Sequence, residues 1–426
     1  MREATVTFED NSLETSTRNS EVPKEELSDF PGQNTIEYIA NRRTSLRARY
    51  YYGTIFLATN LTTWIVRDYG QKLFLHSHYL NACGFGGHDC FHTMGVLRVS
   101  FGCFIFFFFM LLTTIKGTKL YEVQNAWHSG FWPAKFVLLA ASITSAFFFP
   151  PDFIQLYGEF ARVGAGIFLL LQLISVIHFI AWWNNYWMPD EERKQSCSLG
   201  IFVSTISYIT SACGLGLMYK LYIPSSSCML NIFFITWTAV LLMVMMAVSL
   251  HSKVNRGLLS SGIMSLYVVF SCWSAIRSEP GCERCCPQTQ VNGHHVVTVL
   301  SFLIAICAIV AATFSTGIDS ESFQFRRDEA QEDDDIPYNY VFFHLVFSLG
   351  AMYFAMLFIS WNLNHSTRRW SIDTGWASVW VKILNEWLAA TLYVWKLISP
   401  VLRQAKVTDQ EAAVQQTNIE AASTEP

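Results

Sequence analysis

The sequence predicts an all-α, polytopic integral membrane protein with about ten transmembrane helices. Between residues 50 and 402, long apolar stretches recur and are separated by short polar connectors. The runs Phe104–Leu112 and Leu241–Val248 are apolar on every face, whereas the strands of a membrane barrel alternate in polarity. The chain is 52% hydrophobic and only 15% charged, against about 25% charged residues in ordinary soluble domains.

Ten stretches approach the length of about 20 residues that one crossing needs. In order, they cover residues 50–66, 93–115, 131–149, 160–183, 198–219, 231–250, 257–276, 296–315, 340–361 and 378–400. Since lipid offers no hydrogen bonds to an open backbone, each of these runs is expected to be helical. The predicted membrane domain is therefore 50–402, with an acidic connector at 316–339.

Polar tails flank this domain at residues 1–49 and 403–426, and both are predicted to be disordered. No apolar stretch follows a basic leader near Met1, so the first segment does not resemble a cleavable signal. The acidic connector is most simply a solvated loop, and a metal site for a sugar nucleotide is the alternative. Its acidic residues are Asp328, Glu329, Glu332, Asp333, Asp334 and Asp335.

Basic residues predict the orientation, because they concentrate on the cytosolic side of membrane spans. The densest basic cluster is Arg42, Arg43, Arg47 and Arg49, directly before the first span. It places the N-terminus in the cytosol, and an even number of spans places the C-terminus there too. Alternation then makes these residues cytosolic: Lys116, Lys119, Arg193, Lys194, Lys253, Arg256, Arg326 and Arg327.

Cysteines give an independent indication of the same orientation, because disulfides persist in oxidising compartments. Six of the 11 cysteines fall in connectors that the basic residues place outside: Cys83, Cys90, Cys228, Cys282, Cys285 and Cys286. We expect disulfides within connectors 67–92 and 277–295, with Cys228 able to join either. The sequence leaves the pairing open.

The first outer connector is also rich in histidine, which raises the alternative of a zinc site. Beside Cys83 and Cys90 it contains His76, His78, His88, Asp89 and His92. Their spacing matches no standard zinc pattern, and an outer loop favours oxidised cysteines. No metal or other cofactor is therefore predicted.

Ionisable groups inside a membrane are expensive and mark functional sites by default. The candidates for a lipid-headgroup pathway are Arg98, Lys135, Gln172, His178, Lys382 and Glu386. Lys382 and Glu386 are four residues apart, so they share a helix face and are expected to pair. Without a partner, the buried Glu386 carboxyl is expected to be protonated. For Arg98, Lys135 and Lys382 the alternative is that they reach from span ends to the headgroup layer.

Several long motifs between the tails resemble the serine incorporator (Serinc) family of eukaryotic membrane proteins. They occur in the family's order at 96–101 (VLRVSF), 128–135 (HSGFWPAK), 182–187 (WWNNYW), 265–280, 338–344 and 376–395. The resemblance implies a fold in which two helical subdomains are joined by a long tilted helix, here the fourth span. The polar segment 1–35 and the short connector after Pro280 resemble plant-type members. Functions tied to the outer insertions of animal members are therefore not expected here.

The resemblance implies a non-enzymatic, lipid-handling protein. Two roles are expected for the family, namely ATP-independent phospholipid scrambling and facilitation of serine incorporation into phosphatidylserine and sphingolipids. The alternative is a secondary transporter of a small polar solute such as serine, although no inverted repeat is evident. An integral lipid enzyme is disfavoured because no nucleophile elbow or histidine box appears.

The expected partners are membrane phospholipids and sphingolipids, with lipid-synthesis enzymes and a second copy of the chain as further possibilities. The slightly negative net charge of −4 and the lack of a nucleic-acid motif argue against nucleic acid. The expected location is the endomembrane system or the plasma membrane.

Overall fold

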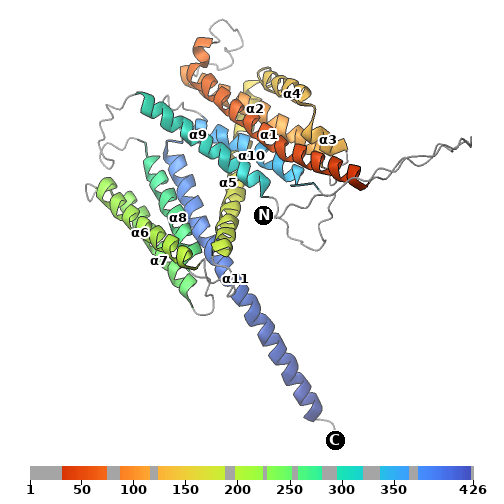
Figure 1. Ribbon diagram of the computed structural model, residues 1–426. Helices are drawn as coiled ribbons and strands as arrows, with labels where there is room; N and C mark the ends of the chain where they lie inside the picture. Colours follow the sequence, from red (N-terminus) through yellow and green to blue (C-terminus); the bar gives the residue numbers. More distant parts are fainter. Residues whose placement is uncertain are drawn as a thin grey trace, which may run out of the picture.

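The computed structural model describes residues 31–73, 87–115, 123–187, 197–223, 228–251, 258–280, 295–319, 336–363 and 373–423. Within these ranges the chain is all-helical, with eleven helices (Figure 1). They are α1 (Pro31–Leu73), α2 (Gly87–Thr114), α3 (Val123–Ser129), α4 (Trp132–Ala146), α5 (Pro151–Trp187), α6 (Cys197–Tyr222), α7 (Met229–Leu250), α8 (Leu259–Arg277), α9 (His295–Ile318), α10 (Tyr340–Phe358) and α11 (Trp376–Ser423).

Each predicted span corresponds to one of these helices, so the prediction of a polytopic helical membrane protein is confirmed. Six of the described helices are long and apolar enough to cross a membrane by themselves: α2, α5, α6, α7, α8 and α10. In contrast, α4 has 15 residues and is about 22 Å long, which is short of the hydrocarbon thickness of about 30 Å. The short α3 before it was not predicted.

Two apolar cores divide the described residues into two groups of helices. The first core draws its buried side chains from α1, α2, α4, α9, α10 and the first half of α5. The second draws them from α6, α7, α8, α11 and the second half of α5. In Figure 1 the first group forms the upper part of the molecule and the second group forms the lower part.

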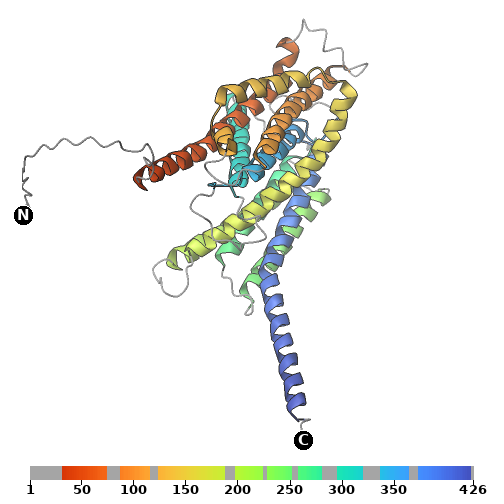
Figure 2. The same ribbon diagram turned by 90° about the vertical axis from the view of Figure 1, so that its right-hand side faces the viewer.

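Helix α5 therefore belongs to both cores. Its residues Ile154 and Ala161 are buried in the first core, and Leu173 and Ile177 are buried in the second. With 37 residues it is about 55 Å long, too long to cross upright, and it runs obliquely through the molecule (Figure 2). The tilted helix expected over 160–183 is thus confirmed and begins nine residues earlier, at Pro151.

The structure differs from the prediction of disordered tails. Helix α1 already begins at Pro31, and its residue Ser45 is fully buried. Helix α11 continues to Ser423 and extends away from the other helices (Figure 1). The sequence after Pro400 contains neither glycine nor proline up to that point and is rich in alanine, glutamate and glutamine, which favour helix.

Candidate functional site

Polar side chains form a stripe along the first half of α11, and we call Lys382, Glu386, Tyr393 and Lys396 the α11 stripe. Their spacings are 4, 7 and 3 residues. At 100° per residue, the other three side chains therefore lie within about 40° of the direction of Lys382 around the helix axis. Glu386 is fully buried and Tyr393 is 3% exposed, whereas the two lysines at the ends are half-buried. The stripe is thus open at its ends and closed in the middle.

Lys382, at one end, pairs with Asp373 rather than with Glu386. Its Nζ lies 2.8 Å from Asp373 Oδ2 and donates to Ser278 Oγ at 2.7 Å. Asp373 reaches this position because the chain folds back onto α10, where its N–H donates to Leu357 O at 3.0 Å. The predicted Lys382–Glu386 pair is therefore wrong, since the fold-back just before α11 supplies a carboxylate within ion-pair distance of Lys382.

Glu386 instead contacts α7. Its Oε1 is 2.7 Å from Thr238 Oγ1, which also lies 2.8 Å from the carbonyl oxygen of Phe234. Thr238 has a single hydroxyl proton, so both contacts are satisfied when the carboxyl group donates to Thr238 and Thr238 donates to Phe234. Oε2 has no hydrogen-bond partner among the described residues. The geometry thus favours the protonated carboxyl that the sequence argument expected for an unpaired Glu386.

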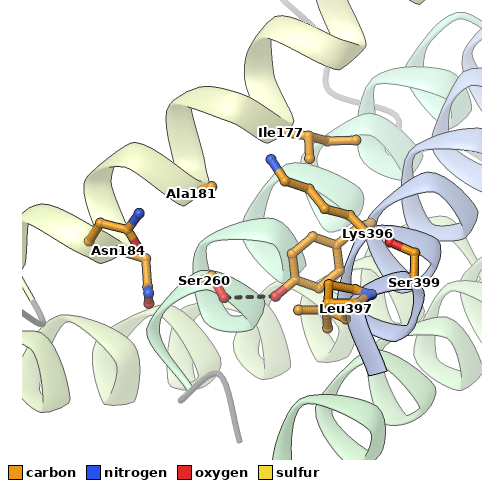
Figure 3. Close-up of a pocket in the computed structure, with 10 residues that line it drawn as sticks. Ile177, Ala181, Asn184, Ser260, Lys396, Leu397 and Ser399 are labelled. Atoms are coloured by element: carbon orange, nitrogen blue, oxygen red, sulfur yellow. Dashed lines mark hydrogen bonds between the residues drawn. The ribbon is translucent and has the colours of Figure 1, made fainter. Parts of the chain in front are cut away.

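Beyond Glu386, the stripe opens into a pocket between α5 and α11, which we call the α5–α11 pocket (Figure 3). Its volume is about 390 Å³. Tyr393 lines it and shares a hydrogen bond of 2.8 Å with Ser260 of α8. The complete lining is Ile177, Ala181, Asn184, Asn185, Ser260, Tyr393, Lys396, Leu397, Ser399 and Pro400.

His178 lies beside this pocket on α5 and is half-buried. Ile177, the residue directly before it, lines the pocket. Asp319, at the end of α9, accepts a hydrogen bond of 2.9 Å from Ser175 Oγ. Gln172 is half-buried on the same helix and takes no part in these contacts. Of these two candidates, only His178 directly follows a residue that lines the pocket.

Arg98 lies away from the stripe and binds the end of α4. It is 7% exposed, and its Nη1 donates to the carbonyl oxygens of Ala146, Phe147 and Phe149 at 2.9, 2.8 and 3.0 Å. The last carbonyls of a helix have no partner within the helix, so a guanidinium there stabilises the helix end. This contact set indicates a structural role for Arg98.

Lys135 is also distant from the stripe and is fully buried. Its Nζ donates to His128 O at 2.8 Å and lies 4.2 Å from the ring centre of Trp132 and 5.1 Å from that of Tyr52. A cation over aromatic faces is attracted by the ring quadrupole. Lys135 therefore does not extend to the headgroup layer, contrary to the alternative that the sequence left open.

The imidazole of His128 continues this buried network. Its Nε2 is 2.8 Å from the hydroxyl of Tyr338, its Nδ1 is 3.0 Å from His344 Nε2, and its ring stacks on Tyr340 with centroids 3.8 Å apart. Burial, and then the charges of His344 and Lys135, lower the pKa of His128 well below its ordinary value. Burial likewise raises the pKa of the Tyr338 hydroxyl. The network is neutral at these two groups and ties α1, α3, α4 and α10 together.

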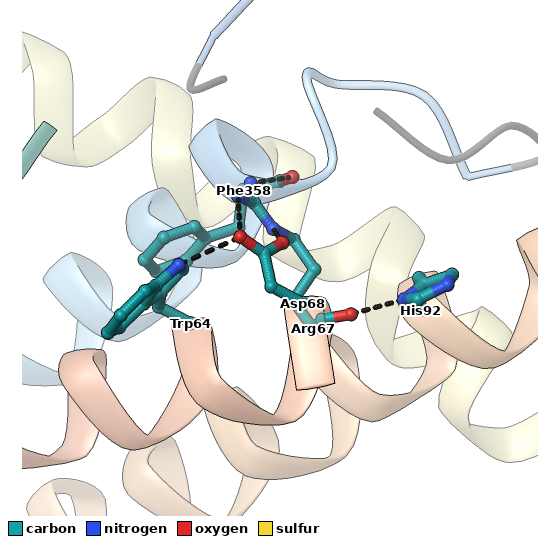
Figure 4. A network of polar contacts seen from close by, with 5 residues as sticks. All are labelled: Trp64, Arg67, Asp68, His92 and Phe358. Atoms are coloured by element: carbon teal, nitrogen blue, oxygen red, sulfur yellow. Dashed lines mark hydrogen bonds and ion pairs between the residues drawn. The ribbon is translucent and has the colours of Figure 1, made fainter. Parts of the chain in front are cut away.

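A third polar group lies at the other end of the first core and was missed by sequence reasoning (Figure 4). Arg67 Nε and Asp68 Oδ1 form an ion pair of 2.7 Å with side chains 3% exposed, and Trp64 Nε1 donates to Asp68 Oδ2 at 2.8 Å. Arg67 also donates to Phe358 O at 3.2 Å, and His92 Nδ1 donates to the Arg67 carbonyl. The sequence placed Arg67 in an outer connector, but α1 continues past it to Leu73.

Sequence reasoning also missed three residues on or beside the stripe: Lys396, which belongs to it, and Asp319 and Asp373. Lys396 lies within the predicted span 378–400 and satisfied the criterion that selected the other ionisable candidates, so it could have been found. Asp319 and Asp373 flank spans, where charged residues are common. Their proximity to α5 and α11 depends on tertiary packing that the sequence does not display.

The predicted disulfides are largely outside the described part of the chain. The free thiols of the described residues are those of Cys103, Cys213, Cys272 and Cys307, all within helices. Cys228 is disulfide-bonded, and its partner is not among the cysteines whose side chains the structure describes. Cys83, Cys282, Cys285 and Cys286 lie outside those ranges, as do His76 and His78 of the zinc alternative, and only the backbone of His88, Asp89 and Cys90 is described. The pairing therefore stays a prediction.

The long apolar helices and the few ionisable groups buried between them define a polytopic helical membrane protein. The chain matches the family described as "Serine incorporator (Serinc)" over residues 32–332 and 320–406. It therefore belongs to the serine incorporator family. This match covers most of the chain, including all the helices around the α11 stripe.

Relatives from animals agree with this assignment. A probable serine incorporator of Nematostella vectensis is 25% identical over 418 residues, which cover 84% of this chain and 91% of the relative. Serine incorporator 3 of Bos taurus is 27% identical over 374 residues, covering 72% and 78%. Serine incorporator 2 of Mus musculus is 28% identical over 363 residues, covering 74% and 80%.

Proposed function

We propose that this protein is a non-enzymatic lipid handler that lets phospholipids exchange between leaflets without ATP. The observation that carries the proposal is the α11 stripe, which places polar groups at successive depths along one membrane helix. A headgroup crossing hydrocarbon loses its hydrogen bonds to water, and this loss makes unaided crossing very slow. Polar side chains along a helix replace part of that hydration and so lower the barrier.

In the described conformation the middle of the stripe is closed. Glu386 reaches Thr238 of α7 at 2.7 Å, Asn385 donates to the hydroxyl of Tyr267 of α8 at 3.2 Å, and Tyr393 bonds Ser260 of α8 at 2.8 Å. A passing headgroup must exchange these contacts for its own. This exchange costs less than passing a headgroup along apolar side chains, because the hydrogen bonds of the stripe are replaced by hydrogen bonds to the headgroup and are not lost.

The experiment that tests the proposal uses purified protein in liposomes that carry a fluorescent phospholipid. A membrane-impermeant quencher is added, and the same liposomes are assayed for uptake of labelled serine. We expect quenching to exceed that of protein-free liposomes without ATP, and serine uptake to equal background. Serine accumulation with no lipid exchange would replace the proposal with the transporter alternative.

Facilitated incorporation of serine into phosphatidylserine and sphingolipids is the second role named for the family, and this role would require contact with lipid-synthesis enzymes. The names of the relatives support it by similarity, while the stripe supports lipid exchange by chemistry. Cytosolic termini, an endomembrane or plasma-membrane location, a plant-type affiliation and self-association are further parts of the proposal.

A further inference from the structure

The α5–α11 pocket has the size and the lining of a ligand site. Its volume of about 390 Å³ falls in the range of small-molecule sites, about 300–1,000 Å³. Its lining divides into an apolar part, with Ile177, Ala181, Leu397 and Pro400, and a polar part. A ligand with one polar and one apolar end fits such a division.

The polar part can bind an anion. Lys396 reaches from α11 toward α5 (Figure 3), and the amide of Asn185 and the hydroxyl of Ser399 supply further donors beside it. Ser260 and Tyr393 hydrogen-bond each other at 2.8 Å, a contact that uses only one of their two hydroxyl protons. An ammonium with several hydrogen-bond donors around it suits the oxygens of a phosphate group.

The same pocket contains an acceptor that needs a donor. Asn184 lines the pocket, and its Oδ1 is shielded from solvent and has no hydrogen-bond partner among the described residues. Leaving a shielded acceptor unpaired is unfavourable, because it has lost its hydrogen bonds to water without replacing them. A primary ammonium carries three N–H donors and can satisfy this oxygen, whereas a quaternary ammonium carries none.

We infer that the α5–α11 pocket binds the headgroup of an aminophospholipid, with the phosphate at Lys396 and the primary ammonium at Asn184. The apolar wall of the pocket then faces the glycerol and the start of the acyl chains. This inference rests on the proposed lipid-handling function and deepens it, because it names the preferred substrate class. Phosphatidylcholine cannot donate to Asn184, and phosphatidylglycerol has no ammonium.

Binding is tested with the full-length protein in detergent, by the rise in unfolding temperature as lipid is added. Phosphatidylethanolamine, phosphatidylcholine and phosphatidylglycerol with identical acyl chains are the probes, and glycerophosphoethanolamine tests the free headgroup. We expect phosphatidylethanolamine to bind most tightly. The K396M variant should bind it about tenfold more weakly, which corresponds to about 1.4 kcal/mol, whereas K396R should retain binding. N184L should abolish the preference over phosphatidylcholine, and the exposed control K220M should change nothing.

Equal binding of the three lipids by the native protein would overturn the inference. So would an unchanged affinity of K396M for phosphatidylethanolamine, or an unchanged preference of N184L over phosphatidylcholine. A response to glycerophosphoethanolamine with none to the lipids would also overturn it, in favour of a soluble ligand. Unfolding temperatures measured without lipid show whether each variant folds. If K396M does not fold, K396R gives a comparison that retains the charge. Selective binding without lipid exchange in liposomes would refute the proposed function alone, and exchange without selective binding would refute this inference alone.

Discussion

Lys135 offers the sharpest test of how the first core is stabilised. The side chain is fully buried, donates to His128 O at 2.8 Å and lies 4.2 Å from the ring centre of Trp132. Lys135→Ala removes this contact and leaves a cavity, and truncating a buried chain of this length costs about 2–5 kcal/mol. Lys135→Met keeps most of the volume and removes the need to desolvate a charge, so its cost should be within about 1 kcal/mol.

The carbonyl of His128 keeps a donor in the Lys135→Met variant, because Tyr52 also donates to it at 2.9 Å. The assay is reversible unfolding of the purified protein in mixed micelles, with the exposed Lys220→Met as control. If Lys135→Met destabilises as much as Lys135→Ala, the charge and not the packing dominates, and the reasoning fails. Since Lys135 lies away from the α11 stripe, lipid exchange by a folded Lys135→Met protein should be unchanged.

Three further predictions concern other parts of the chain. Burial lowers the pKa of His128 below the ordinary 6.5, so the folded state binds that proton less readily than the unfolded state, and the stabilising contribution of neutral His128 is fully present above about pH 6.5 and declines below it. Thermal unfolding measured across pH should show this decline for the native protein and a smaller decline for His128→Gln. An equal decline in both proteins would contradict the assignment. Most of the cysteines Cys83, Cys90, Cys282, Cys285 and Cys286 should resist alkylation until a reductant is added, and full labelling without reductant would reopen the zinc alternative. Tags at either terminus should be inaccessible from outside intact cells, and labelling of a tag without permeabilisation would refute the cytosolic orientation.

The helical membrane fold could be predicted because hydropathy acts locally. Each of the ten apolar runs corresponds to a helix, since lipid leaves the backbone no alternative. The oblique course of α5 came from the family resemblance, and the structure accounts for it by the burial of Ile154 in one core and Ile177 in the other. Helix ends were predicted less well, because Ser45 and Arg67 extend α1 through tertiary contacts with α3 and α10.

The candidate site could be predicted only in part. Glu386 and Lys382 were chosen because charges inside spans are costly, and both lie on the stripe. Their partners, Thr238 and Asp373, are 148 and nine residues away along the chain, respectively, and no local pattern specifies either contact. Lys135 and Arg98 met the same criterion, but the structure gives each of them contacts with carbonyl oxygens that stabilise the first core.

The most direct test of the central claim is the lipid-exchange rate of Glu386→Ala in liposomes, compared with the native protein. Glu386 is the fully buried centre of the α11 stripe, and its contact with Thr238 is a single hydrogen bond, worth about 1 kcal/mol net. We predict markedly slower exchange by a variant that still folds. Unchanged exchange together with a clear loss of thermal stability would show that Glu386 is structural, and that lipids do not pass along α11.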